Sequence, residues 1–431
     1  MISMNEGNNI KTLFWNCNGL RERKQETEEI IHRMKLDIIM ISETHLKSGS
    51  KIKFINYTMY RCDRTESRGG GVAILVKKNI QHSQVRFDDL CSIEAIGVTI
   101  NIPNQGKVTF ASVYKSPNNP LLSNDLDIIF NSCDSVIVCG DLNCKSPLWN
   151  STCTNPNGKI LEEYLSKKEL IVLGPTSPTH FSTYGSFDVL DISILKNVCC
   201  PSSIESLCEL SSDHNPVLLE LKCTPECNET LVKFTNWVAF QEQLDKSISC
   251  SSMFSSIDTM VSHLETVVIS SLEKATNTTK RKKFELVIPV ALQELIRERR
   301  RQRRISMTTL CPKDKKYYNW LNTKVKRELS SLYNSRWESK LKSLRVSDKS
   351  LWKITKSLKS TRSNPSSVSH NNVLYYSDSD KANVFSEYLN NSNTPSNDHS
   401  DINFISLFVK DSLSSPSSCD VCIDSKEVKS H

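Results

Sequence analysis

Short apolar runs rich in Val and Ile recur through the first half of the chain, and polar turns separate them. Runs of this kind predict buried β-strands, because they lack the spacing of three and four residues that marks a helix. We expect strands at Lys11–Gly19, Asp37–His45, Tyr57–Cys62, Gly71–Val76, Ser92–Ile102, Lys107–Tyr114, Ser135–Asn143, Asp188–Leu195 and Val217–Leu221. Two stretches predict helices instead, at about Glu22–Met34 and Lys159–Leu170.

The pattern changes after Cys223. Ser, Thr, Asn and Lys become frequent, the strand pattern stops, and residues 234–272 have helical spacing. Residues 291–304 predict a helix that ends in a cluster of arginines, and a second helix is expected at Tyr317–Leu344. From about residue 391 the chain is polar, and we expect it to be disordered. These changes divide the chain into residues 10–223, a basic helical region at 224–362, a short segment at 363–390 and a tail at 391–431.

The net charge of +7 hides an uneven distribution of charge. Residues 1–224 hold 23 Lys and Arg against 25 Asp and Glu, whereas residues 280–362 hold 25 against 7. A near-neutral domain followed by a strongly basic one suggests catalysis in the first and contact with a polyanion in the second. Two interpretations of the basic helices remain open, a helical hairpin with a solvated face and a nucleic-acid-binding surface. The arginine run also fits the pattern of a nuclear-import signal.

The remaining composition narrows the class of protein. A length of 431 residues allows two or three domains and at least one large core. The sixteen cysteines are scattered singly and the first nine residues are mostly polar, which favours a reduced, intracellular protein of the nucleus and cytoplasm. No window approaches the roughly 18 apolar residues of a membrane helix, so we expect no membrane partner.

Polar side chains mark the ends of the predicted strands. In Gly140-Asp141-Leu142-Asn143 the carboxylate and the amide lie two residues apart, so on an extended backbone they point to the same side. By itself this motif also fits a Gly-Asp turn that closes a strand. Other strand ends carry similar groups, namely Asn16, Asn18, Glu43, Tyr114, Asp191, Asp213 and His214.

These side chains outline a hydrolytic site. Glu43 ends a buried strand, where a carboxylate is costly to desolvate unless a metal or another cation pairs with it. Oxygen ligands without His and Cys spacing favour Mg²⁺ or Mn²⁺ over zinc. Asp191 is either an edge residue that faces water or a buried carboxylate that holds His214. A supported histidine, together with Asp141 to take a proton from water, would suit the cleavage of a phosphoester.

Six motifs follow one another along the strand-rich half. They are Trp15-Asn16-x-Asn18-Gly19-Leu20, Ser42-Glu43-Thr44, Val113-Tyr114, Gly140-Asp141-Leu142-Asn143, Leu190-Asp191-Ile192 and Ser212-Asp213-His214. In this order they resemble the endonuclease/exonuclease/phosphatase superfamily, which includes apurinic endonucleases and pancreatic deoxyribonuclease. The match covers about Thr12 to Lys222.

Further motifs point to one branch of that superfamily. They are Arg68-Gly69-Gly70-Gly71, Ser146-Pro147-Leu148-Trp149 and Pro178-Thr179-His180. They resemble the endonuclease domains of jockey-like non-LTR retrotransposons of arthropods. Residues 350–355 and 376–383 resemble the linker of those elements, and the reverse transcriptase that would follow it is missing from this chain.

The resemblance implies a four-layer α/β sandwich of two mixed sheets with outer helices over residues 10–223. It also implies a metal site with Glu43 as the principal ligand and Asn18 and Asp213 nearby, although Asn18 stands where apurinic enzymes carry Asp. The remaining roles it implies are Asp141 to activate water, Asn16 and Asn143 to bind the phosphate or a ligand carboxylate, Tyr114 to stabilise the pentavalent phosphate, and Asp191 to orient His214.

Three places in the chain are candidates for DNA contact. The glycine-rich loop with Arg68 can approach a phosphate backbone, although it also fits a flexible hairpin. An irregular loop at Pro175–Phe187 offers His180 and Tyr184 for insertion into a groove. In the basic helix the candidates are Arg299, Arg300 and Arg301.

The leading hypothesis is a Mg²⁺-dependent DNA endonuclease of a non-LTR retrotransposon. It would nick one strand of double-stranded DNA and leave a 3′-hydroxyl that primes reverse transcription of the element's RNA. Two alternatives remain open, a truncated, inactive relic that only binds nucleic acid and a phosphatase of small or lipid substrates. The basic second half disfavours the phosphatase.

Overall fold

The computed structural model describes residues 9–65, 69–182, 186–223, 231–248, 256–280, 287–346, 349–359, 368–371, 373–375 and 378–393. The chain divides into two compact units, Met1–Val368 and Ser369–His431. The predicted tail from residue 394 onward, Arg68 and Tyr184 lie outside the described residues. The strand-rich part of the first unit, residues 10–223, is called the sandwich domain below.

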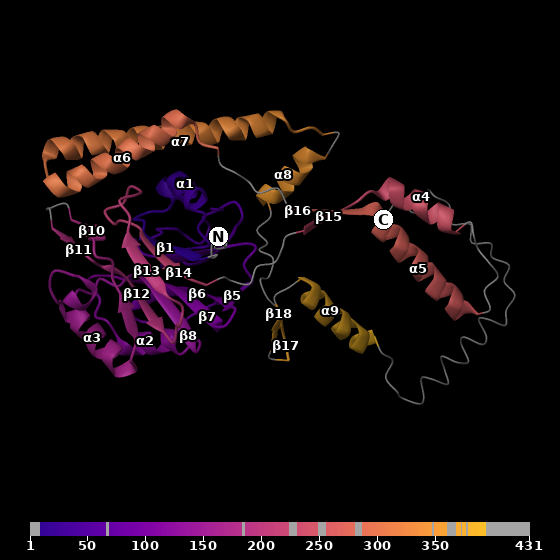
Figure 1. The fold of residues 1–431 in the computed structure, drawn as a ribbon, viewed down its shortest axis with the longest axis horizontal. Helices are drawn as coiled ribbons and strands as arrows, with labels where there is room; N and C mark the ends of the chain where they lie inside the picture. The colour runs from indigo at the N-terminus through magenta and orange to yellow at the C-terminus, as the bar shows by residue number, and fades with distance from the viewer. Residues whose placement is uncertain are drawn as a thin grey trace, which may run out of the picture. The chain divides into compact units, whose positions relative to one another are not determined.

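Two six-stranded mixed sheets form the centre of the sandwich domain (Figure 1). The first has the order β13 (Ser202–Ser206), β14 (Val217–Leu221), β1 (Ile10–Asn16), β2 (Ile38–Ser42), β4 (Val72–Lys77) and β3 (Tyr57–Cys62). The second has the order β5 (His82–Val85), β6 (Ile93–Ile102), β7 (Gly106–Lys115), β8 (Ser135–Asp141), β12 (Asp191–Lys196) and β9 (Ile171–Leu173). β1 runs parallel to β2, and β7 runs parallel to β8, whereas the other neighbours are antiparallel.

Both faces of each sheet are apolar, which produces three cores. Successive residues of a strand point to opposite faces. Phe14 therefore belongs to the core between the two sheets, while Leu13 and Trp15 belong to the core beneath α1 (Lys24–Met34). A third core lies between the second sheet and the helices α2 (Ser123–Phe130) and α3 (Pro156–Lys168). The order of layers is helix, sheet, sheet, helix, which confirms the α/β sandwich (Figure 1).

Several elements differ from the sequence prediction. The loop expected at Pro175–Phe187 contains part of a short hairpin, β10 (His180–Phe181) with β11 (Phe187–Asp188). The expectation that strands stop after Cys223 is wrong, because two ribbons follow it: β15 (Leu231–Thr235) with β16 (Thr276–Lys280), and β17 (Val368–His370) with β18 (Val373–Tyr375). These strands have five residues or fewer, which is too short for a hydrophobic alternation to be distinct.

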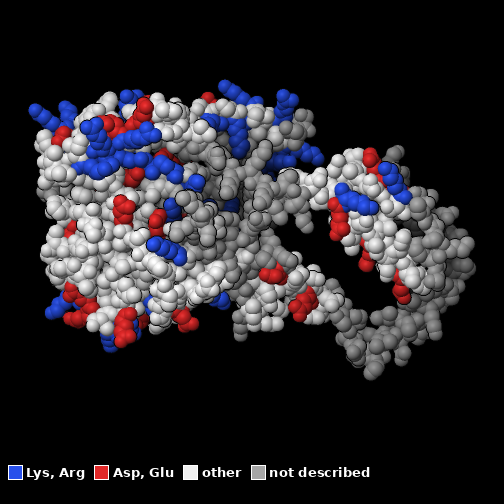
Figure 2. Space-filling view, viewed as in Figure 1, with Lys and Arg blue, Asp and Glu red and all other residues white. Residues whose placement is uncertain are grey.

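The basic region is helical, as expected. Residues 234–272 contribute to α4 (Trp237–Ile248) and α5 (Ile257–Ala275), and α8 (Ser350–Lys359) and α9 (Asp378–Asn393) follow later. Between them, α6 (Val290–Thr309) and α7 (Pro312–Lys342) pack side by side as a helical hairpin, and α7 contacts α1 (Figure 1). Figure 2 shows Lys and Arg side chains gathered over this hairpin. None of the described helices is long and apolar enough to cross a membrane.

Candidate active site

The polar strand ends meet at one edge of the two sheets. Asn16 is the last residue of β1, and Glu43 follows the end of β2. In the second sheet Asp141 ends β8, where it is the register partner of Tyr114 on β7 and of Asp191 at the start of β12. The structure thus brings together residues that are far apart in the sequence, because both sheets end at the same side of the sandwich.

Asn16 connects carboxylates of the two sheets. Its Nδ2 donates hydrogen bonds to Glu43 Oε1 and to Asp141 Oδ2, each at 2.9 Å. Its Oδ1 accepts a hydrogen bond at 3.2 Å from the backbone N–H of Asn18, and the side-chain Nδ2 of Asn18 donates to Asp213 Oδ1 at 3.3 Å. Asn16 is only 1% exposed, so its amide acts as a fixed link between groups of the site.

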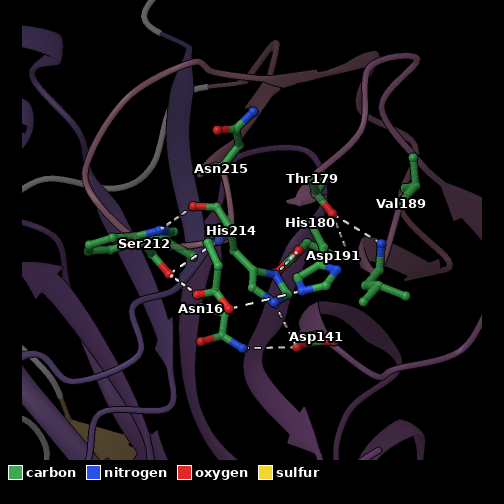
Figure 3. A network of polar contacts seen from close by, with 12 residues as sticks. Asn16, Asp141, Thr179, His180, Val189, Asp191, Ser212, His214 and Asn215 are labelled. Carbon is green, nitrogen blue, oxygen red and sulfur yellow. Dashed lines mark hydrogen bonds and ion pairs between the residues drawn. The ribbon is translucent and has the colours of Figure 1, made fainter. Parts of the chain in front are cut away.

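His214 lies between two buried aspartates, on a loop (Leu210–Asn215) that we call the His214 loop (Figure 3). Its Nδ1 is 2.7 Å from Asp191 Oδ2, and its Nε2 is 3.7 Å from Asp141 Oδ2. Asp191 is therefore a buried carboxylate that holds the histidine and not an edge residue that faces water. Its other oxygen, Oδ1, has no hydrogen-bond partner among the described residues.

Burial and charge shift the pKa values of these groups. Burial raises the pKa of Asp141 to about 7, because the charge of Asp191 adds to burial and the charge of His214 only partly opposes it. For His214, burial disfavours the charged imidazole, but the charge of Asp191 and the hydrogen bond to it prevail and raise the pKa to about 10. Burial also raises the pKa of Tyr114, and the charge of Glu43, which its hydroxyl contacts, adds to this effect. Near neutral pH the site therefore combines a partly protonated carboxyl group with an imidazolium.

The predicted metal ligands lie in the more accessible part of the site. The side chain of Glu43 is 22% exposed, with its Oε2 3.4 Å from His45 Nε2, and that of Asp213 is 45% exposed. Burial would raise the pKa of Asp213, but the charge of His214 and hydrogen bonds from Ser212 and Asn18 lower it. Carboxylate and amide oxygens of this kind fit a hard divalent cation.

Among the described residues, acidic and histidine side chains also form two clusters whose ligand atoms are close enough to bind one ion. One contains His180, Asp213 and His214, and the other contains Asp141, Asp191 and His214. Asp213, a predicted ligand, belongs to the first of these clusters. The site therefore offers grouped oxygen and imidazole atoms as candidate metal ligands.

Unusual backbone conformations occur at the site. Asn18, Glu43 and Asn143 have φ values of 45°, 50° and 49°, in the left-handed region that non-glycine residues rarely adopt. Such strain costs about 1–3 kcal/mol and is concentrated at functional sites. Gly140 does not make the Gly-Asp turn that was the alternative interpretation of its motif. It lies within β8, where an added Cβ would be 1.9 Å from the carbonyl oxygen of Val113, so only glycine fits.

Asn143 is placed beside the site by its own hydrogen bonds. Its backbone N–H donates to Asp141 Oδ1 at 3.0 Å, and its side-chain Nδ2 donates to the carbonyl oxygen of Lys115 at 2.9 Å. The side-chain nitrogen is therefore engaged by the protein. The second N–H of this nitrogen is the donor through which a role toward phosphate is predicted, because the amide oxygen only accepts hydrogen bonds.

Of the two residues predicted for groove contact, His180 is described, and it lies close to the catalytic histidine candidate. The ring centroid of His180 is 4.6 Å from that of His214, and its Nε2 is 4.0 Å from Asp213 Oδ2. Thr179 is fully buried, and its Oγ1 accepts the backbone N–H groups of Leu190 and Asp191. Thr179 thus supports the site from within.

The predicted DNA-binding arginines of α6 do not share one environment. Arg299 is 2% exposed and pairs with Glu26 at 3.1 Å, and Arg300 pairs with Glu209 at 2.7 Å. The side chain of Arg301 is 74% exposed. This differs from the expectation that all three contact DNA, because α6 packs against the sandwich domain and turns part of the arginine run inward.

Arg303 was missed as a site residue by sequence reasoning. It lies 3% exposed against the His214 loop, with its Nη2 2.8 Å from the carbonyl oxygen of Ser212. The two residues are 91 positions apart in the sequence. Helical phase within the arginine run shows which arginines share a side, but the sequence has no signal for the surface that this side contacts.

The comparisons with known proteins agree with the motifs. Residues 108–218 match a family model described as endonuclease-reverse transcriptase. The chain is 27% identical over 373 residues to a probable RNA-directed DNA polymerase from transposon BS of Drosophila melanogaster, covering 82% of this chain and 41% of the relative. It is 25% identical over 410 residues to the RNA-directed DNA polymerase from the mobile element jockey of the same species, covering 90% and 44%. The chain is thus similar in sequence to the RNA-directed DNA polymerases of transposon BS and of the mobile element jockey.

This relationship confirms the resemblance drawn from the motifs. The chain spans about two fifths of the length of the curated relatives it matches. Among solved structures, it is similar to the endonuclease domain of TRAS1, a telomere-specific non-LTR retrotransposon, with 20% identity and a TM-score of 0.41 over 50% of this chain and 98% of that one. An AP endonuclease from Leishmania major has 13% identity and a TM-score of 0.41 over 51% and 89%.

Proposed function

We propose that the sandwich domain, residues 10–223, is a DNA endonuclease that cleaves one phosphodiester bond of a duplex and leaves a 3′-hydroxyl. The observation that carries this proposal is the buried arrangement of Asp141, His214 and Asp191 at the edge where both sheets end. Asn16 and Glu43 lie beside it. A base, a cation and anchored amides in one place are what phosphoester hydrolysis requires.

In this proposal each buried group has a separate task. Asp141, whose pKa is raised to about 7 by burial, accepts a proton from the attacking water at a pH near neutrality. His214 stays protonated because Asp191 holds it, and its charge faces the negative charge that grows on the phosphate. Asn16 keeps Asp141 in place through its 2.9 Å hydrogen bond. Tyr114 contributes its hydroxyl from the neighbouring strand.

We propose that Glu43, Asn18 and Asp213 hold Mg²⁺ or Mn²⁺, since their oxygen donors are those that hard cations prefer. When bound, the cation supplies positive charge that stabilises the scissile phosphate and the leaving oxygen. The hydrogen bonds from Asn16 to Glu43 and from Asn18 to Asp213 orient the two carboxylates before any ion arrives.

The relationship to retrotransposon proteins supports a role for the cleaved end. In an intact element the 3′-hydroxyl would prime reverse transcription of the element's RNA, so the substrates would be chromosomal DNA and, beyond this domain, that RNA. The exposed arginine Arg301 and the other basic side chains of the α6–α7 hairpin would help to hold the DNA. Because chromosomal DNA lies in the nucleus, the protein would act there after its synthesis in the cytoplasm.

A plasmid-nicking experiment tests the proposal. Supercoiled DNA is incubated with the full chain and Mg²⁺, with and without EDTA, and the products are extended by a DNA polymerase without prior treatment of the ends. We expect nicking with Mg²⁺ and no nicking when EDTA is added. We also expect the polymerase to extend the nicked strands directly, because they carry a 3′-hydroxyl. Tight DNA binding without nicking in either Mg²⁺ or Mn²⁺ would refute the proposal and favour the inactive relic.

A further inference from the structure

The arginine run of α6 has two sides. Residues four apart lie on one side of a helix, so Arg299 and Arg303 point the same way, while Arg301 and Arg304 point elsewhere. Arg299 and Arg303 are 2% and 3% exposed, whereas Arg301 and Arg304 are exposed. The inward side contacts the sandwich domain, so this part of the basic cluster is not a surface for DNA.

The inward side of α6 contacts an acidic face of α1. The helix buries three glutamates, Glu26, Glu28 and Glu29, although buried carboxylates are costly unless they are paired. Arg299 Nη1 lies 3.1 Å from Glu26 Oε2, and Arg300 Nη2 lies 3.8 Å from Glu29 Oε1. Glu28 and Glu29 also pair within α1, with Lys24 and Arg33, so Glu26 is the buried glutamate whose countercharge comes from the hairpin. This pair holds α6 against the sandwich domain.

Arg303 extends this contact to the His214 loop. Its Nη1 donates to the carbonyl oxygen of Leu210 at 2.7 Å, and its Nη2 donates to that of Ser212 at 2.8 Å. Its Nε donates to Asn215 Oδ1 at 3.1 Å, and a longer contact of 3.5 Å joins Nη2 to the carbonyl oxygen of His214. These acceptors are neutral oxygens of a single loop, and the rigid guanidinium spans them.

The His214 loop has a conformation that requires such support. Leu210 has a φ of 57°, which a branched apolar residue adopts only when its surroundings hold it. The sandwich domain also holds the loop, because Trp15 Nε1 donates to the carbonyl oxygen of His214 at 3.1 Å and the backbone N–H of Phe181 donates to that of Asp213 at 3.0 Å. Without Arg303 the carbonyl groups on its side of the loop would be buried with one donor fewer.

We propose that Arg303 is a positioning residue, which holds the His214 loop so that His214 stays between Asp141 and Asp191. The effect on cleavage rate rests on the proposed endonuclease function, but the effect on the loop does not. The basic helices then do more than contact DNA, because one of their arginines is part of the support of the active site.

Two matched substitutions test this proposal in the full chain. Arg303→Gln and Arg304→Gln remove the same charge from adjacent positions of α6, one buried and one exposed. Arg303→Lys keeps the charge but replaces the guanidinium fork by a single ammonium, which covers the case in which Arg303→Gln fails to fold. Backbone hydrogen exchange of a peptide covering residues 209–216 reports on the loop, and steady-state nicking over a range of DNA concentrations separates kcat from KM.

We expect exchange in the loop to become at least about tenfold faster in both Arg303 variants and to stay unchanged in Arg304→Gln. We expect kcat to fall by about tenfold to 100-fold in the Arg303 variants, with KM within about twofold, because the loop is displaced while DNA contacts remain. Wild-type exchange in a folded Arg303→Lys variant would overturn the proposal, as would a loss confined to KM. If the wild-type chain itself does not nick DNA, the endonuclease proposal fails, and loop exchange alone decides the role of Arg303.

Discussion

Replacing Asp191 by Asn should inactivate the site through charge while leaving its shape nearly intact. Asp191 is fully buried, and its Oδ2 lies 2.7 Å from His214 Nδ1. Its charge is the main reason that the pKa of His214 is raised to about 10, against burial, and it also contributes to the raised pKa of Asp141. A negative charge favours the protonated form of both neighbours. Asp191→Asn should therefore lower both pKa values.

The size of the effect follows from these values. Without the charge of Asp191, burial disfavours the imidazolium and only the charges of Asp141 and Asp213 favour it, so the pKa of His214 should fall toward its ordinary value of 6.5. A group with that pKa is roughly 3% protonated at about pH 8. If the imidazolium is needed, the rate at that pH should fall by up to about 30-fold, and by more if the ring also loses its orientation. The deficit should shrink toward about pH 6, because the variant recovers its imidazolium there while the wild-type Asp141 becomes protonated.

Single-turnover nicking of a supercoiled plasmid across a pH series measures this. The wild-type rate should rise with pH through about 7, as Asp141 loses its proton, and both limbs of the profile should move to lower pH in the variant. Asp127→Asn, a matched change on α2 at a carboxylate paired with Lys168, should leave rate and profile unchanged. A folded Asp191→Asn variant within about threefold of the wild-type rate at every pH would refute the assigned roles.

Three further changes give sharp outcomes. Glu43→Gln should abolish Mg²⁺-dependent nicking without changing the melting temperature, and normal nicking by the folded variant would remove Glu43 from the metal site. His180→Ala should redistribute nick sites, mapped by sequencing 3′ ends, more than it lowers the total rate, whereas an unaltered map with slower nicking would place His180 in catalysis. Gly140→Ala should lower the free energy of unfolding by about 3 kcal/mol in a urea titration, because its Cβ would be 1.9 Å from the carbonyl oxygen of Val113. Gly49→Ala, where a Cβ meets nothing within 4 Å, should cost far less, and equal costs would contradict the packing argument.

Much of the fold was predictable because strand periodicity is a local property. Alternate apolar residues of β1 face different cores, and the runs that end at Asn16, Glu43 and Asp141 are visible without any structure. What such runs do not show is pairing. The ribbon of β15 and β16 joins segments 41 or more residues apart, and the polar β16 has no apolar run to reveal it.

The candidate active site was likewise only partly predictable from the sequence. Sequence alone determined which residue types stand at strand ends and therefore which chemistry they allow. Tertiary structure decided that Asp141 and Asp191 meet in register around His214, that burial raises the pKa of Asp141, and that the charge of Asp191 raises the pKa of His214. It also decided that Arg303 faces inward while Arg301 faces solvent. Both arginines carry the same charge, and the sequence does not tell them apart. Only the packing of α6 on the sandwich domain buries Arg303 and leaves Arg301 exposed, because burial depends on how the layers assemble.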